Sequence, residues 1–380
     1  MLKEKLTAKN ASVCFFCALL FVLFAQFLLP DKSFSETEKR VLSQRPPFRI
    51  ETLFSGKLES ELETYIQDQM PFRNFWVGLC SYFNALTGQN GTDGIYAAKD
   101  GYLIQTPNAD NPRNLRTNLK RLNAFAQQTE TPAYLLIVPQ TGYILPDKLP
   151  RGHAAYNDDA LFSQIKAQTA DSYTFVDLRQ TFADAREKTQ IYYKTDHHWT
   201  SEGAFLAANA FLREAGKTPL TKDMFEIEPV SGFYGTTYSR AALWGRKPDT
   251  MELWKIRGAS LSTVVTDLGS DEKTECDDVF FREHLKEYDR YPVYLDGNHS
   301  LTHIVNDAVP DGTLLLLKDS FGNTLATQLA AAYHEIWMID LRYYRTQAVS
   351  QLLTQYGADA VLVNYSVEDI VNDTNFVWLK

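Results

Sequence analysis

The sequence predicts an α/β fold built on a mostly parallel sheet, with an apolar helix ahead of it. Short apolar runs, each about the length of a strand and bounded by turn residues, alternate with segments of helical period through most of the chain. Such strands are buried on both faces, which is typical of parallel sheets covered by helices. The length of 380 residues allows one large domain with additional parts.

The first predicted element is an apolar run at residues 13–29, in which Gln26 is the only strongly polar residue. About 17–25 apolar residues cross a bilayer, so the run is just long enough for a transmembrane helix. Three lysines precede it, and the positive-inside rule then keeps the N-terminus in the cytoplasm. We expect residues 1–30 to be a single-pass anchor in the cell membrane, with the remaining chain extracytoplasmic; a cleaved signal peptide is the alternative.

Residues 31–112 are expected to form a stalk and a helical lead-in. The stretch 31–49 is polar and contains prolines, as linkers do. Apolar residues at helical spacing over 54–86, interrupted at Met70-Pro71, predict two amphipathic helices. Two short apolar runs after them predict a hairpin, with strands at 95–96 and 102–104.

Residues 113–380 carry the alternating pattern of the α/β domain. The predicted strands lie at 133–138, 173–178, 291–295, 313–317, 336–339 and 360–363. The predicted helices lie at 115–128, 158–170, 201–215, 323–332 and 347–356. The stretch from about 225 to 290 lacks this alternation and is rich in Gly, Thr, Ser and aromatic residues, so we interpret it as an insertion with short strands of its own.

Composition narrows the partners and cofactors. The formal net charge is -9 and there is no basic tract, which argues against nucleic acid as a partner. Outside the apolar run the cysteines are Cys80 and Cys276, and one disulfide or two free thiols are both compatible with that count. Because no Cys/His grouping has zinc-binding spacing, we expect neither a metal nor another cofactor.

A candidate acid–base pair lies in the segment 194–203, between a predicted strand and a predicted helix, where open α/β sheets place functional loops. The segment contains Asp196, His197 and His198. A carboxylate beside a histidine fixes the tautomer of the imidazole and stabilises the imidazolium that forms in catalysis. Asp196 and His198 suit this role; a metal site and a structural cap are the alternatives.

Ser320 follows the predicted strand 313–317 and precedes the predicted helix 323–332. This arrangement exposes a hydroxyl beside the backbone N–H groups of a helix start, which stabilise an oxyanion. An ordinary helix N-cap is the alternative. Because Asp196 and His198 supply a base elsewhere in the chain, we predict that Ser320 is a nucleophile.

Further polar and aromatic residues are candidates for lesser roles. Asn298 and Asn323 are candidate oxyanion donors, although Asn298 suits a turn equally well. Tyr234, Tyr238 and Arg240 combine aromatic rings with a cation, which suits a sugar-binding wall, and a plain hairpin is the alternative.

The tetrad Asp196-His197-His198-Trp199 resembles the DHHW family, which is named for it, and more broadly the alginate O-acetylase group of extracytoplasmic proteins. Shorter matches in the same order lie at 35–40, 54–57, 68–73, 297–299, 318–321 and 340–344. The resemblance implies an SGNH-hydrolase-like three-layer domain. The chain departs from the group at Gln140, where those relatives tend to carry Lys after the proline.

The resemblance also implies a Ser-His-Asp triad, with Ser320 as the nucleophile, His198 as the base and Asp196 as the acid. His197 and Trp199 are then candidates for substrate contact. We therefore expect a cell-surface O-acetyltransferase or acetylesterase that acts on an extracytoplasmic polysaccharide and receives acyl groups from a membrane-bound O-acyltransferase. The rival interpretation is a catalytically silent glycan-binding or assembly protein of the cell envelope.

Overall fold

The computed structural model of the chain describes residues 2–26, 28–108, 111–267 and 273–379. The chain forms two compact units. The first comprises Met1–Gln89 with Ala242–Trp244, and the second comprises Asn90–Ala241 with Gly245–Lys380. The first unit contains the predicted stalk and lead-in helices, and the second contains all of the predicted sheet.

The first unit is mainly helical. Its elements are α1 (Leu2–Gln26), β1 (Phe34–Ser35), β2 (Arg40–Val41), α2 (Ile50–Phe54), α3 (Lys57–Gln69) and α4 (Arg73–Leu86). Pro71 lies in the break between α3 and α4, as its missing N–H predicts. Asp68 accepts hydrogen bonds from Arg40 at 2.6 and 3.0 Å, and Arg73 donates to Glu38 at 2.7 Å. These contacts join the β1–β2 hairpin to the break between the helices.

The predicted membrane anchor falls largely within α1. Among the residues that the structure describes, no helix combines the length and the apolar character that a membrane crossing requires. Phe27, which belongs to the predicted anchor, lies outside the described residues. The anchor therefore remains a prediction from the sequence.

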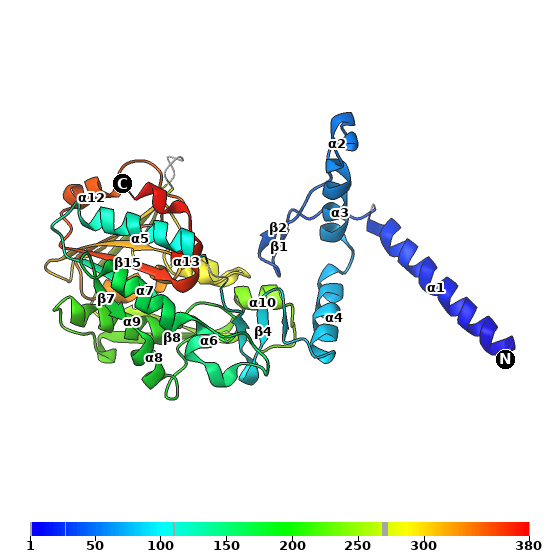
Figure 1. Ribbon diagram of the computed structural model, residues 1–380, viewed down its shortest axis with the longest axis horizontal. Coiled ribbons are helices and arrows are strands. Elements are labelled where there is room, and N and C mark those ends of the chain that lie inside the picture. The colour runs from blue at the N-terminus through cyan, green and yellow to red at the C-terminus, as the bar shows by residue number, and fades with distance from the viewer. Residues whose placement is uncertain (1, 27, 109–110, 268–272, 380) are drawn as a thin grey trace. The chain divides into compact units, whose positions relative to one another are not determined.

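An eight-stranded sheet forms the centre of the second unit, in the order β11-β10-β12-β14-β13-β15-β6-β7. Figure 1 shows β15 and β7 of this sheet with helices such as α5 and α9 around them. The five strands from β14 to β7 run parallel, and β12, β10 and β11 add antiparallel strands at one edge. The bounds are β6 (Ala133–Val138), β7 (Thr174–Asp177), β10 (Leu261–Thr266), β11 (Lys273–Cys276), β12 (Leu301–Asn306), β13 (Thr313–Lys318), β14 (Glu335–Ile339) and β15 (Ala360–Ser366). The predicted, mostly parallel sheet is confirmed.

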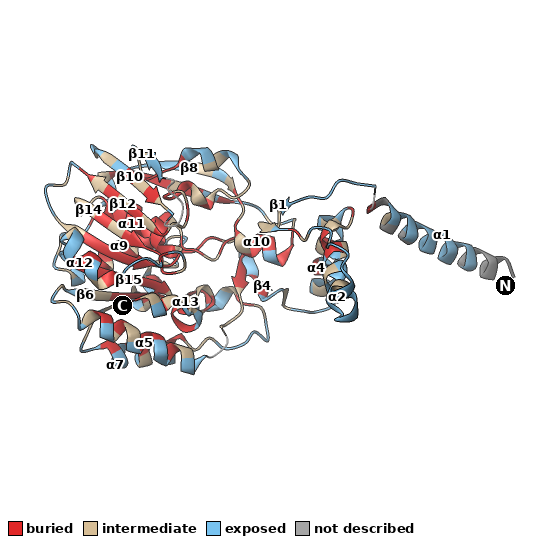
Figure 2. Cartoon of the chain, turned by 90° about the horizontal axis from the view of Figure 1, so that it is seen from above, coloured by how far each residue is buried: buried red, intermediate tan, exposed pale blue. Residues whose placement is uncertain are grey.

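Helices cover both faces of this sheet. One face packs against α5 (Pro112–Ala126), α7 (Asp158–Thr169), α12 (Val349–Tyr356) and α13 (Val367–Asn372). The other packs against α8 (Arg179–Ala185), α9 (Ser201–Glu214) and α11 (Phe321–Leu329). Along β13, Leu314 and Leu316 enter one core while Leu315 and Leu317 enter the other, because successive side chains of a strand alternate between faces. Figure 2 shows the buried residues gathered along the sheet, α9 and α11.

The predicted insertion contributes two kinds of strand. β8 (Phe225–Phe233) and β9 (Asp249–Ile256) form a sheet of their own, whereas β10 and β11 extend the main sheet. The short helix α10 (Thr236–Ala241) lies between β8 and β9, and α6 (Thr141–Ile144) follows β6. The predicted hairpin near residue 100 is also present, as β4 (Ile95–Ala97) and β5 (Leu103–Gln105), with β3 (Gly91–Thr92) beside β4.

The predicted strand at 291–295 is wrong. Tyr291–Val293 form a turn of 3-10 helix, and Leu295 and Asp296 have positive φ angles of 58° and 60°. Pro292 lacks the N–H that a central strand needs, and its fixed φ suits the start of a helical turn. The apolar side chains of this segment are buried without belonging to a strand. Cys80 and Cys276, for which the sequence left a disulfide or two thiols open, are free thiols.

Candidate active site

Ser320 lies between the end of β13 and the first turn of α11. The preceding residue holds this turn: Asp319 is almost fully buried, and its carboxylate accepts hydrogen bonds from the backbone N–H of Phe321 at 3.0 Å and of Ser366 at 2.6 Å. Ser320 occupies the N-cap position of α11, but its hydroxyl makes no capping bond within the described chain. The hydroxyl is instead directed to His198.

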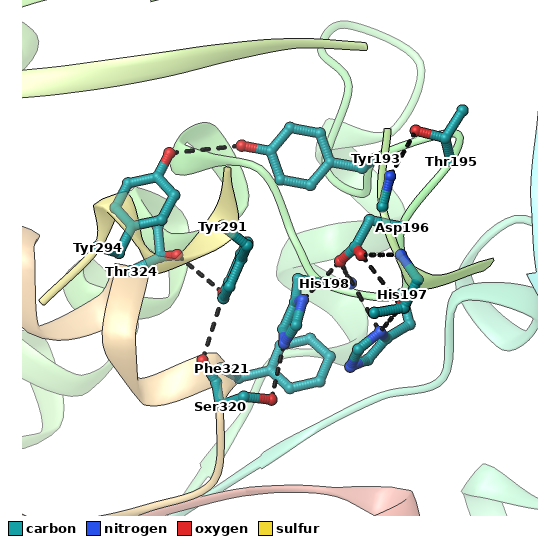
Figure 3. A network of polar contacts seen from close by, with 12 residues as sticks. Tyr193, Thr195, Asp196, His197, His198, Tyr291, Tyr294, Ser320, Phe321 and Thr324 are labelled. Atoms are coloured by element: carbon teal, nitrogen blue, oxygen red, sulfur yellow. Dashed lines mark hydrogen bonds and ion pairs between the residues drawn. The ribbon is translucent and has the colours of Figure 1, made fainter. Parts of the chain in front are cut away.

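His198 connects Ser320 to Asp196 (Figure 3). Its Nε2 lies 2.7 Å from Ser320 Oγ, and its Nδ1 lies 2.5 Å from Asp196 Oδ1. An ionised carboxylate only accepts hydrogen bonds, so Nδ1 carries the proton and Nε2 is left to accept from the serine hydroxyl. The ring of Tyr291 stacks on the imidazole at 3.9 Å with an angle of 11° between the planes. Packing and hydrogen bonds together fix the orientation of the ring.

Asp196 is held by Thr236, the first residue of α10. Its Oδ2 accepts hydrogen bonds from the Thr236 backbone N–H at 2.7 Å and from the Thr236 hydroxyl at 3.1 Å, and its Oδ1 also accepts from the His198 backbone N–H at 2.9 Å. A Cβ on Gly235 would come within 2.1 Å of the Asp196 side chain, so only glycine allows this close approach. The carboxylate is 2% exposed and fully hydrogen-bonded, which suits it to orient an imidazole.

His197 lies beside His198 but has a different partner. Its Nδ1 is 2.6 Å from Thr236 Oγ1, and its ring centroid is 3.8 Å from that of His198. Burial, followed by the repulsion of a neighbouring imidazole, lowers the pKa of His197 to about 4. His197 is therefore neutral near pH 7.

A cleft of about 560 Å³ opens over Ser320. The hydrogen-bonded row of Ser320, His198 and Asp196 lines this cleft. Three other candidate residues from the sequence analysis also line it: His197, Asn298 and Arg240. Sequence reasoning missed several further polar residues of the wall: Gln105, Gln140, Thr236, Glu368, Asp369, Arg342 and Tyr343. The cleft wall thus combines many polar side chains with apolar ones such as Val138 and Phe321.

Three predicted substrate-contact residues do not line the cleft. Trp199 is fully buried and packs edge-on against Phe321 at 5.3 Å. Tyr234 and Tyr238 stack on each other at 4.2 Å, and the Tyr234 hydroxyl donates to a backbone carbonyl at 3.2 Å. Of the predicted sugar-binding wall only Arg240 reaches the cleft, where it also contacts Asp93. A sequence pattern identifies aromatic residues but not the side to which they turn.

The two predicted oxyanion donors differ in placement. Asn298 lines the cleft, whereas Asn323 is fully buried behind it. The amide N–H₂ of Asn323 donates to Gly297 O at 2.9 Å and to Asn298 Oδ1 at 3.2 Å. Both of its hydrogens are thereby used, so Asn323 supports Asn298 instead of facing a substrate.

A cluster of charged residues lies near Ser320, and two of its members, Arg342 and Asp369, also line the cleft. Lys318 and Asp340 are each about 1% exposed in their side chains and lie 3.3 Å apart, and Arg342 donates to Asp340 at 2.6 and 2.9 Å. Burial lowers the pKa of Lys318 to about 8 against the opposing pull of Asp340. Burial and the nearby carboxylate of Asp319 raise the pKa of Asp369 to about 7. The shorter matches at 318–321 and 340–344 contain all of these residues except Asp369, and that signal pointed to them without giving a role.

Two groups in the described chain have the geometry to hold a metal ion: Asp196 with His197 and His198, and Glu283 with His284 and Asp296. In the first group both ring nitrogens of His198 already have partners, so coordination there would break the bond to Ser320 or to Asp196. In the second group His284 pairs with Asp296 at 2.5 Å and with Glu287 at 2.9 Å. Ion pairs account for these contacts.

A serine at the end of a central parallel strand, facing a histidine–aspartate loop in a three-layer α/β domain, is the arrangement of an SGNH hydrolase-like protein. Residues 95–232 match the ALGX family, described as the SGNH hydrolase-like domain of the acetyltransferase AlgX. The matched residues include Asp196 and His198 and end before Ser320.

Relatives and solved structures agree with this assignment. The probable alginate O-acetylase AlgJ of Pseudomonas putida is 25% identical over 209 residues, covering 48% of this chain and 54% of the relative. AlgJ of Pseudomonas syringae is 26% identical over 186 residues, covering 47% and 46%. The chain therefore spans about half the length of the curated relatives it matches.

Two solved structures share the fold. A DHHW family protein from Eubacterium siraeum has a TM-score of 0.62 at 21% identity, over 75% of this chain and 94% of that one. Bacillus cereus PatB1 with a sulfonyl adduct has a TM-score of 0.61 at 19% identity, over 75% of this chain and 100% of that one. The predicted resemblance to the DHHW family and to the alginate O-acetylases is confirmed.

Proposed function

We propose that this protein is a serine-dependent O-acetyltransferase, or acetylesterase, that acts on a polysaccharide outside the cytoplasm. The observation that carries the proposal is the hydrogen-bonded row of Ser320, His198 and Asp196, with distances of 2.7 and 2.5 Å. A general base must lie within about 2.6–3.2 Å of the group whose proton it accepts. The buried carboxylate fixes the tautomer that leaves Nε2 free to do so.

The reaction proceeds through an acyl-enzyme. His198 Nε2 accepts the Ser320 proton as Oγ attacks the carbonyl carbon of an acetyl ester, and the imidazolium is stabilised by Asp196. His198 then returns the proton to the leaving oxygen, and the ester bond to the donor breaks. In the second half an acceptor hydroxyl gives its proton to His198 and attacks the acyl carbon. The bond between the acyl carbon and Ser320 Oγ then breaks, and His198 gives the proton to Oγ, which restores the free serine. Water as acceptor gives hydrolysis, and a sugar hydroxyl gives transfer.

The negative charge that develops on the carbonyl oxygen needs hydrogen-bond donors. The Ser320 backbone N–H and the Asn298 side-chain amide, which lines the cleft beside Ser320, are suited to this role. Acid–base action contributes about 10²–10⁴-fold in rate, and each oxyanion donor about 10²–10³-fold. These terms together are enough for an efficient ester-processing site.

The relatives support acyl transfer as the reaction class, because AlgX is described as an acetyltransferase and AlgJ as a probable alginate O-acetylase. The polar side chains of the cleft wall support a hydroxyl-rich acceptor. Residues 13–29 act as the membrane anchor, and a membrane-bound O-acyltransferase supplies the acyl group. The protein then works at the outer face of the cell membrane.

Hydrolysis of a chromogenic acetyl ester by the purified protein tests the proposal. We expect Ser320→Ala to reduce release to background and His198→Ala to lower kcat by at least about 10²-fold. His153→Ala, which changes an exposed histidine outside the cleft, serves as the matched control and retains wild-type turnover. A sulfonyl fluoride probe should label Ser320 in the wild type but not in His198→Ala.

Two other outcomes separate the rival interpretations. Equal release by the wild type and Ser320→Ala, with no labelling, would contradict catalysis and favour a silent glycan-binding protein. Loss of wild-type activity on chelation would favour metal hydrolysis at Asp196, His197 and His198, since the triad mechanism predicts no effect of a chelator.

A further inference from the structure

A buried lysine lies directly behind the candidate oxyanion site. Lys318 is the last residue of β13 and is 1% exposed. Its Nζ donates hydrogen bonds to Asn298 Oδ1 at 2.8 Å and to Asp340 Oδ2 at 3.3 Å. Burying an ammonium group costs free energy unless it is paired, and Asp340 already has a second cation, Arg342. The arrangement therefore needs a reason beyond neutralising Asp340.

The contacts of Asn298 provide that reason. A carbonyl oxygen accepts two hydrogen bonds, and Asn298 Oδ1 receives both from buried side chains: one from Lys318 and one from Asn323 Nδ2 at 3.2 Å. If the amide were rotated by 180°, its N–H₂ would face an ammonium and a second N–H₂. Donors would then oppose donors, so this rotamer is excluded.

The consequence is that the N–H₂ of Asn298 must lie on the other side of the amide. Asn298 lines the cleft that also contains Ser320, so its free donors are directed away from the buried pair of Lys318 and Asn323. A cation at the carbonyl end also draws electron density toward Oδ1, which makes the N–H groups stronger donors. Lys318 thus affects both the direction and the strength of the donor.

We propose that Lys318 is a positioning residue for the acyl-transfer reaction, because it fixes and polarises the amide of Asn298 as an oxyanion donor. This inference rests on the proposed function and goes beyond it, since Lys318 itself touches neither the substrate nor Ser320 Oγ. Asn323 assists from the same side through its own hydrogen bond.

A double-mutant cycle in the full chain tests the role. Lys318→Met, Asn298→Ala and the double variant are compared in the hydrolysis of a chromogenic acetyl ester, with kcat and KM measured separately. Loss of one oxyanion donor lowers kcat by about 10²-fold or more. We expect Lys318→Met to lower kcat by about 10-fold or more with little change in KM, and the double variant to match Asn298→Ala alone.

Two controls separate positioning from a loss of folding. Asn298→Asp keeps an oxygen that accepts from Lys318 and Asn323 but has no N–H, so we expect a kcat as low as that of Asn298→Ala with a thermal midpoint near the wild type. Arg342→Met removes the other cation of Asp340 without touching Asn298. Any fold-decrease in kcat caused by Arg342→Met should therefore multiply with the fold-decrease caused by Asn298→Ala when the two changes are combined.

The possible results are distinguishable. If the wild type is active and Lys318→Met has an unchanged kcat, the role of Lys318 is overturned. The same holds if the fold-decreases in kcat of Lys318→Met and Asn298→Ala multiply in the double variant. Both results leave the proposed function intact. An inactive wild type whose Ser320 resists the sulfonyl fluoride probe would overturn the proposed function and this inference together.

Discussion

His197 and His198 are neighbours in the sequence, yet their surroundings give them different chemistry. His198 is 4% exposed and lies between a serine hydroxyl and a carboxylate. His197 faces the Thr236 hydroxyl, and burial together with the adjacent His198 lowers its pKa to about 4. A second charged imidazole would compete with the imidazolium that forms on His198. Keeping His197 neutral leaves the Asp196 carboxylate to stabilise His198 alone.

This difference predicts how stability changes with pH. The unfolded chain protonates His197 near pH 6.5, whereas the folded protein protonates it only near pH 4. The unfolded state therefore binds more protons between these values, and the free energy of unfolding falls as the pH drops from 6.5 toward 4. At pH 5 the loss from this group is about 2 kcal/mol. Between pH 7.5 and pH 5 we therefore expect the free energy of unfolding of His197→Gln to fall by about 2 kcal/mol less than that of the wild type, as measured by urea unfolding. If the free energies of unfolding of the two proteins changed equally with pH, the lowered pKa of His197 would be contradicted.

The residues that carry the proposed chemistry were predictable, but those that position them were not. Ser320, His198 and Asp196 stand out because each is a reactive residue type at a strand end or loop, where functional side chains collect. Lys318 also ends a strand and lies in the short match at 318–321, but neither signal indicates that its side chain turns into the protein and contacts Asn298. Asn323 and Trp199 were expected to face the substrate and are fully buried instead. Only the tertiary packing of α11 and α9 decides on which side these residues lie.

The turn between β13 and α11 presents Ser320. Asp319 ties this turn to β15 through its backbone N–H, which donates to Asn364 O at 3.1 Å, and through its carboxylate. Asp319 accepts from the backbone N–H of Phe321 and of Ser366, one group on α11 and one at the end of β15. Burial raises the pKa of Asp319 against these hydrogen bonds, so the carboxylate is costly to hold in place. The cost indicates that the position of the turn matters.

Asp319→Asn tests this link between elements. The amide retains one acceptor, but its N–H₂ faces a backbone N–H that it cannot satisfy. We expect a loss of about 2 kcal/mol in the free energy of unfolding, the usual effect of breaking a buried charge-assisted bond. We also expect a lower kcat, because one of the side-chain hydrogen bonds that fix the Ser320 turn is lost while the backbone bond to Asn364 remains. Chemical denaturation and ester hydrolysis measure the two effects, and a stable variant with full kcat would contradict the role of Asp319.

The burial pattern of each strand explains which strands could be predicted from the sequence. β6, β13 and β14 are nearly wholly apolar, because both faces of a parallel sheet are covered. β12 was missed because only alternate residues of Leu301–Asn306 are buried, so its polar side chains obscure the pattern. The apolar run at 291–295 predicts a strand, but its apolar residues are buried in a turn instead. An apolar run therefore predicts that a segment is buried more directly than it predicts that the segment is a strand.

At the scale of the whole molecule, every residue that lines the cleft belongs to the second unit. The first unit has its own polar network, in which Asp68 accepts from Arg40 and from the Ser43 backbone N–H at 2.8 Å. The hydrogen bond from Arg40, resisted by burial, holds the pKa of Asp68 at about 2. This network joins the hairpin to the break between α3 and α4, and none of its residues lines the cleft.

The variant Asp68→Asn therefore tests whether the stability of the first unit affects the activity of the cleft. The amide cannot accept from both guanidinium nitrogens of Arg40, so the first unit should lose about 1.5–3 kcal/mol, as expected for a hydrogen bond to a charged group. Limited proteolysis should then cut within residues 31–89 faster than in the wild type, while kcat for ester hydrolysis stays the same. Glu51→Gln, on the exposed side of α2, is the matched control and should change neither rate. A fall in kcat that parallels the faster proteolysis would contradict a site built by the second unit alone, and the first unit would then have to be counted as part of the catalytic machinery.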